Sequence, residues 1–143
     1  MTITSEKEVQ KLTDLIFSLR NTMEQVGTVA DEVDDRRLRI ALSGLADEGC
    51  NYADELRSQL AVLGISTWVN SEYFGEPGEV TRGENELQNL CNRFENYLAN
   101  AYRSIISDSL SLPSIKQLLI YQYESIKAGF QKVRLLNETR PVA

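Results

Sequence analysis

Histidine is absent from this 143-residue chain, and its absence excludes several kinds of chemistry. Serine–histidine and cysteine–histidine nucleophilic pairs, histidine general bases and imidazole metal ligands are all ruled out. Any reaction would depend on carboxylates, tyrosines, lysines or a bound metal. No catalytic residue can be assigned from the sequence, so we expect a protein that is not an enzyme; the alternative is a metal-dependent oxidoreductase.

Cysteine and long apolar runs are scarce as well. The two cysteines, Cys50 and Cys91, lack the spacing of a metal finger or a redox motif, so we expect both to be free buried thiols. No apolar run is long enough to span a bilayer, and residues 1–8 lack the apolar core of a signal peptide. These absences predict a cytoplasmic protein with no membrane partner.

Positive charge is in the minority, with 15 lysines and arginines against 21 aspartates and glutamates, a net charge of −6. Nucleic-acid binding requires basic patches, so we expect no nucleic-acid partner. The hydrophobic share of 42% and the charged share of 25% are ordinary for a soluble globular protein. The length fits a single domain over residues 1–143.

What the sequence does contain is apolar residues at spacings of three and four, which predict long helices packed in a bundle. The clearest such pattern is in the first helix: Val9, Leu12, Ile16, Leu19, Met23, Val26, Ala30 and Val33. Four helices are predicted, at about residues 5–33, 35–63, 82–107 and 113–137. In the third helix, Cys91 and Tyr102 are expected at the edge of the apolar stripe.

The ends of these helices carry recognisable signals. Two helices begin with the spacing of a capping box, Ser5 with Glu8 and Thr81 with Glu84. An aspartate of Asp34-Asp35 can cap the second helix, and Gly64 can end it. Pro113 suits the first turn of the fourth helix. Inside the second helix, Gly44 and Gly49 each weaken the helix by about 1 kcal/mol relative to alanine. A close contact with a neighbouring helix would explain both glycines.

The link between the second and third helices, at about 64–81, is much longer than a tight turn. About 17 residues can extend over roughly 55 Å, whereas a helix of about 26 residues is about 39 Å long. The link can therefore travel the full length of the bundle, with Trp68, Tyr73 and Phe74 covering its surface. The sequence thus predicts an all-α, ferritin-like four-helix bundle, in which two antiparallel hairpins are joined by a long crossover link.

One glutamate lies near the middle of each predicted helix, roughly 15 to 20 Å from a helix end. The four are Glu24, Glu48, Glu95 and Glu124. Carboxylates buried together repel one another unless a cation lies between them, and oxygen ligands suit iron or manganese. The four glutamates are therefore the candidate metal ligands and iron or manganese the candidate metals, although the sequence assigns no cofactor.

The alternative is that these glutamates are solvated or form salt bridges. Arg20 stands four residues before Glu24, and Lys127 three residues after Glu124, both of which are ion-pair spacings. A di-iron bundle also has histidines three residues after two of its glutamates. Asn51 and Lys127 occupy those positions here, and neither replaces a nitrogen ligand.

The chain also resembles a family of bacterial ferritin-like four-helix-bundle proteins that is classed as a domain of unknown function. The matching segments cover nearly the whole chain: Glu24 with Ala30-Asp31-Glu32-Val33, Leu45-Ala46-Asp47-Glu48, Asp54-Glu55-Leu56, Leu63-Gly64, Arg93-Phe94-Glu95, Ala101-Tyr102, Leu112-Pro113, Gln122-Tyr123-Glu124 and Val133-Arg134-Leu135-Leu136. The resemblance implies a small bacterial protein with a ferritin-like fold and no established activity. It places the acidic mid-helix positions of the family on the same four glutamates.

Two functions follow from these patterns. The first is a weak or degenerate carboxylate metal-binding protein, based on the four glutamates. The second is a non-catalytic, stress-associated or protein-interaction bundle, based on the missing nitrogen ligands and the acidic surface. We also expect a homodimer formed through a helix face, although the sequence does not indicate which face.

Overall fold

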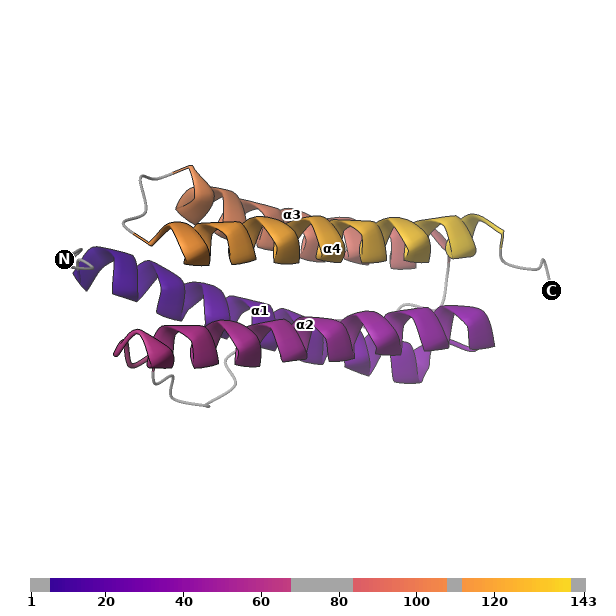
Figure 1. Ribbon diagram of the computed structural model, residues 1–143. Helices are drawn as coiled ribbons and strands as arrows, with labels where there is room; N and C mark the ends of the chain where they lie inside the picture. Colours follow the sequence, from indigo (N-terminus) through magenta and orange to yellow (C-terminus); the bar gives the residue numbers. More distant parts are fainter. Residues whose placement is uncertain (1–5, 68–83, 108–111, 140–143) are drawn as a thin grey trace.

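The computed structural model describes residues 6–67, 84–107 and 112–139, which form helices and no strand (Figure 1). The helices are α1 (Glu6–Glu32), α2 (Arg36–Val62), α3 (Glu84–Ile106) and α4 (Pro113–Glu138). The prediction of an all-α four-helix bundle is confirmed. None of the helices in the described ranges carries an apolar stretch of the length that a membrane span requires.

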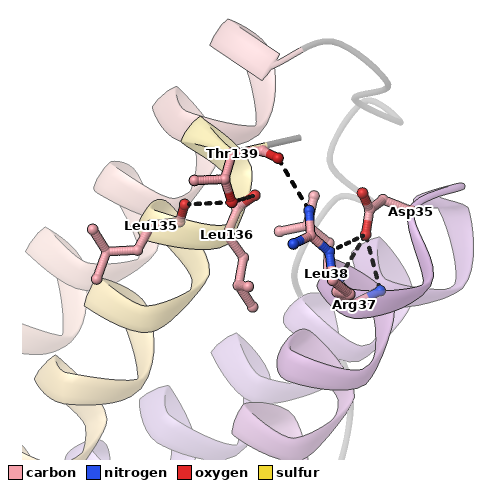
Figure 2. Close-up of polar contacts among 6 residues, drawn as sticks. All are labelled: Asp35, Arg37, Leu38, Leu135, Leu136 and Thr139. Carbon is pink, nitrogen blue, oxygen red and sulfur yellow. Dashed lines mark hydrogen bonds and ion pairs between the residues drawn. The ribbon is translucent and has the colours of Figure 1, made fainter. Parts of the chain in front are cut away.

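Helix α2 begins at an aspartate cap, as the sequence predicted. The Asp35 carboxylate accepts hydrogen bonds from the backbone N–H groups of Arg37 and Leu38, at 2.9 and 3.2 Å. At the same end of the bundle, the Arg37 side chain donates to the carbonyl of Thr139, just beyond α4, at 3.1 Å. Figure 2 shows how these contacts tie the start of α2 to the end of α4.

The other predicted helix ends are described in part. Gly64, which follows α2, has a φ of 79°, a left-handed conformation that favours glycine and stops a helix. Pro113 occupies the first turn of α4. Ser5 and Thr81, the two expected capping residues, lie outside the described residues, as do Trp68, Tyr73 and Phe74 of the link.

Helix α1 packs on α2 and α3, and α4 also packs on α2 and α3. Paired contacts give the directions. Arg37, near the start of α2, bonds to Thr139 just after α4, whereas Tyr52, later in α2, bonds to Ser125 within α4. Helices α2 and α4 therefore run antiparallel. Glu95 and Tyr102 of α3 likewise bond to residues 134 and 122 of α4. Helices α2 and α3 are therefore parallel to each other and lie on one diagonal of the bundle; α1 and α2 form one layer in Figure 1, and α3 and α4 the other.

The core consists of leucines, isoleucines and valines from all four helices, with two aromatic side chains, Tyr102 and Phe130, fully buried among them. The expected seam of α1 is buried from Leu12 onward. Tyr102 was expected at the edge of its stripe, but its side chain is fully buried. Its hydroxyl can be buried because it donates a hydrogen bond to the side-chain carbonyl of Gln122, at 3.2 Å.

Candidate functional site

The four predicted metal ligands lie in different surroundings, and Glu95 is the most tightly held. Its two carboxylate oxygens accept hydrogen bonds from the guanidinium of Arg134 on α4, at 3.1 and 3.0 Å. The same guanidinium donates to Asn92 at 2.9 Å. Both partners of the pair are about one-fifth exposed, 22% for Arg134 and 23% for Glu95. This planar, two-bond arrangement joins α3 to α4 and already neutralises the Glu95 carboxylate.

Glu24 and Glu124 are exposed on the outside of the bundle. Glu24 forms an ion pair with Arg20, four residues earlier on α1, at 3.9 Å. This is the helical spacing that favoured the salt-bridge alternative in the sequence. Arg20 also reaches Asp54 on α2, at 3.1 Å, so its charge is shared between two carboxylates.

The described residues contain no group of three or more histidine, cysteine, aspartate or glutamate side chains that could hold a metal ion. The structure does not bring Glu24, Glu48, Glu95 and Glu124 together in one layer, and metal binding by these residues stays a prediction. Two of them face solvent and a third is bound to an arginine. The interior of the bundle contains apolar side chains and a neutral tyrosine–glutamine pair in place of clustered carboxylates. Such an interior has no buried negative charges that a cation would need to neutralise.

That neutral pair belongs to a polar network which the sequence did not predict. Gln122 of α4 is fully buried and accepts from the Tyr102 hydroxyl, while its amide N–H donates to the backbone carbonyl of Tyr52 at 3.0 Å. The Tyr52 hydroxyl in turn donates to the Ser125 hydroxyl at 2.9 Å. Helices α2, α3 and α4 are thus connected through one buried amide. A glutamine on an apolar face was the signal in the sequence that could have indicated it.

Burial raises the pKa of two tyrosines, Tyr52 and Tyr102, and of both cysteines. It raises the pKa of Tyr52 to about 12, with the negative charge of Glu48 adding to the effect, and it also raises the pKa of Tyr102. The pKa of the Cys91 thiol is raised to about 11, again mainly by burial. Both cysteines are free; Cys91 is buried as expected, but Cys50 is partly exposed. At neutral pH these groups are protonated and therefore weak nucleophiles.

Glu48 occupies a different kind of place, a groove of about 550 Å³ on the outer surface between α2 and α4. Six side chains of α2 and three of α4 line this groove, which we call the α2/α4 groove: Arg37, Ile40, Ala41, Gly44, Leu45 and Glu48, with Gly129, Lys132 and Leu136. Its lining is mainly apolar. Ile40 is 62% exposed beside it, an unusually large exposure for an isoleucine within a helix.

The two glycines that line the groove have different surroundings. A Cβ atom on Gly129 would lie 2.6 Å from Cδ1 of Leu45, so any larger residue there would force the buried Leu45 side chain to move. A Cβ atom on Gly44 would meet nothing within 4 Å. Nothing inside the described molecule therefore requires Gly44, although it weakens the helix by about 1 kcal/mol relative to alanine. Its effect is to leave the floor of the groove open.

Opposite charges mark two positions along the groove. Arg37 and Lys132 contribute positive charge toward the start of α2, and Glu48 contributes negative charge about 16 Å further along that helix. Glu48 forms no ion pair within the described residues. An apolar surface with separated charges is able to bind a helix, and nothing in its lining points to bond-breaking chemistry. Comparisons of the chain with family models, with curated proteins and with solved structures give no match.

Proposed function

We propose that this protein is a non-catalytic interaction bundle that binds an amphipathic helix of a protein partner in the α2/α4 groove. The partner helix has an apolar face, an acidic residue placed to meet Arg37 and a basic residue placed to meet Glu48. Helices bind in grooves of this kind by inserting apolar side chains at spacings of three and four, while charges at the rim select orientation.

The observation that carries this proposal is Gly44. A mid-helix glycine with open space beside it lowers helix stability without improving the packing of its own chain. The presence of Gly44 is explained if a partner's side chain uses the space. The exposed Ile40 and the partly buried Leu136 on either side of the groove offer apolar surface to that side chain.

We also propose that the bundle has the ferritin-like, single-crossover topology predicted from the sequence. Support comes from α2 and α3, which follow each other in the chain, are parallel and lie on a diagonal. A connection between such helices has to return along the length of the bundle, as it does in bundles with one crossover. Three of the four mid-helix glutamates are exposed or bound to arginine, so the proposal gives them no role in binding a metal. The role of the bundle is then to hold α2 and α4 in place on either side of the groove.

The proposal can be tested with a synthetic helix as the probe. A suitable probe is a hydrocarbon-stapled, fluorescent peptide of residues 36–51, which carries both an acidic and a basic end. Leu38→Gln and Leu42→Gln in the peptide remove the face that is buried in the intact protein. Binding is followed by fluorescence anisotropy with the protein at low concentration, and we expect saturable binding.

The matched control is a protein with Gly44→Trp. Because no atom lies near the Cβ position, the tryptophan can occupy the groove without displacing the core. We expect the peptide to bind this variant at least about tenfold more weakly, with an unchanged helical circular dichroism spectrum. Equal binding to both proteins, or no binding to either, would contradict the proposal.

A further inference from the structure

We infer that the partner helix is α2 of a second copy of this chain, docked antiparallel so that the two α2/α4 grooves face each other. This inference rests on the proposed function and specifies its partner. The two-fold axis lies between the two α2 helices, at the level midway between Leu42 and Ser43. The arrangement assigns a face to the homodimer that the sequence led us to expect.

The first support is the register of α2. The six α2 residues of the groove are arranged symmetrically about the midpoint between residues 42 and 43. Positions 37, 40 and 41 lie as far before this midpoint as positions 48, 45 and 44 lie after it. In an antiparallel pair, the level of Arg37 is therefore that of the second copy's Glu48, and the small residues Ala41 and Gly44 share a level. Every α2 residue of the groove has a counterpart under one axis.

The second support comes from α4, which flanks the same axis. Leu45 contacts the Gly129 position and Arg37 bonds to Thr139, so Lys132 lies close to the level of the axis. Gly129 and Leu136 lie at similar distances on its two sides. Under the same symmetry, Leu136 of one copy faces Gly129 of the other, where the Leu45 side chain of that copy fills the space beside the glycine and offers an apolar surface. On α2 the small residues Ala41 and Gly44 meet each other, and the larger apolar residues Ile40 and Leu45 share the next level.

The third support is electrostatic. Arg37 donates to the Thr139 carbonyl at 3.1 Å and lies 3.8 Å from the Asp35 carboxylate. Figure 2 shows Arg37 between these two residues. Its side chain is still 51% exposed. A guanidinium has five N–H donors, so donors remain for a second carboxylate. The second copy's Glu48 would supply it, and the symmetry forms this ion pair twice. Lys132 near the axis carries the opposing like charge, which the two ion pairs must outweigh.

A second copy explains this pattern better than an unrelated helix does. An unrelated helix fits the spacing of the six positions as well, because that spacing is common to any face of an α-helix, but it has to supply both complementary charges itself. Here the positive end, the small central residues and the negative end repeat in reverse order. This self-complementarity is the requirement for a closed dimer with two-fold symmetry.

The test is a charge exchange followed by sedimentation velocity. The unmodified chain is expected to sediment as a concentration-dependent dimer. Arg37→Glu places two carboxylates together, and Glu48→Arg places two guanidinium groups together, so each variant alone should lose at least about tenfold in dimer affinity. Mixing the two variants restores opposite charges at both positions, and a heterodimer should form.

Further variants keep the result decisive. Arg37→Glu also removes the bond to Thr139, so its fold is checked by circular dichroism; if it does not fold, Gly44→Trp decides, because it should give a folded monomer. A chain that stays monomeric up to about 1 mM, or a dimer that persists in Gly44→Trp, would overturn the inference. Peptide binding by a monomeric chain would overturn only the self-association, whereas failure of the peptide as well would overturn the proposed function.

Discussion

Helix α2 carries two glycines five positions apart, Gly44 and Gly49. They lie on two sides of the helix that differ in how closely other side chains pack against them. Toward α1, a Cβ atom on Gly49 would overlap the buried Met23 side chain. Toward the α2/α4 groove, a Cβ atom on Gly44 would meet nothing. The same residue type, at the same cost to the helix, is explained by internal packing in one place and leaves open surface in the other. The comparison separates what folds this chain from what remains available to a partner.

The largest effect is expected from filling the closed side. Gly49→Leu inserts a side chain where Met23 already packs, and overpacking of this kind should lower the free energy of unfolding by about 3 kcal/mol. Gly44→Leu, the matched control, should leave monomer stability unchanged or raise it by up to about 1 kcal/mol, because leucine favours the helix. Urea denaturation at a protein concentration that keeps the chain monomeric measures both.

A second substitution identifies the cause of that loss. In a Met23→Ala background, space is available beside residue 49, so the penalty for Gly49→Leu should be smaller than in the unmodified chain. If the two penalties simply add, the loss does not come from the contact with Met23. If Gly44→Leu destabilises the monomer as much as Gly49→Leu, the difference between the two sides of α2 is not real.

The two glycines also show how far the sequence could be interpreted. Apolar periodicity predicted the four helices and most of their buried faces, because helical spacing determines which residues share a side. A close helix contact was expected at both glycines, but only the structure distinguishes Gly49 from Gly44. The distinction depends on which neighbour faces each position, and no local pattern in α2 encodes that neighbour.

The same limit explains why the four predicted metal ligands do not lie together. Depth along a helix can be counted from the sequence, so the four glutamates were correctly placed away from the helix ends. The direction of each carboxylate depends on the rotation of its helix, and the partner of Glu95, Arg134, lies 39 residues away. Membership of the bacterial ferritin-like family stays a prediction.

Two carboxylates extend the comparison between closed and open surfaces. Glu95→Gln removes the charge that Arg134 binds in the partly buried α3/α4 interface, and we expect a loss of about 1 kcal/mol in stability after solvent screening. Glu48→Gln changes a groove residue with no ion pair in its own chain, so it should leave monomer stability within about 0.5 kcal/mol. Guanidinium denaturation of dilute protein compares them; equal losses would contradict the assignment of Glu48 to an open surface.

Tyr52 belongs to the polar network that joins α2 to α4. Because its phenol is partly buried, the stability of the folded chain should depend on pH in the alkaline range. Burial raises its pKa to about 12 from an ordinary value of 10.0, so the folded state holds the phenolic proton more tightly than the unfolded chain does. The resulting stability is fully present below about pH 10 and is lost as the pH rises toward 12. Stability measured across this range should fall more steeply for the unmodified chain than for Tyr52→Phe. Parallel curves would place Tyr52 in solvent.

The smallest effect is expected at Lys132, because its positive charge weakens the proposed dimer. If two copies dock about the proposed axis, their Lys132 side chains lie nearest to each other, and like charges at a surface repel by about 0.2 to 1 kcal/mol. Lys132→Gln should therefore tighten the dimer by up to about fivefold, whereas Lys127→Gln, on an exposed part of α4 outside the groove lining, should have little effect. Sedimentation at low and high salt provides the measurement. The gain should shrink as salt screens the repulsion. A weaker dimer for Lys132→Gln would mean that this lysine binds a carboxylate of the second copy, and that the axis lies elsewhere along the groove.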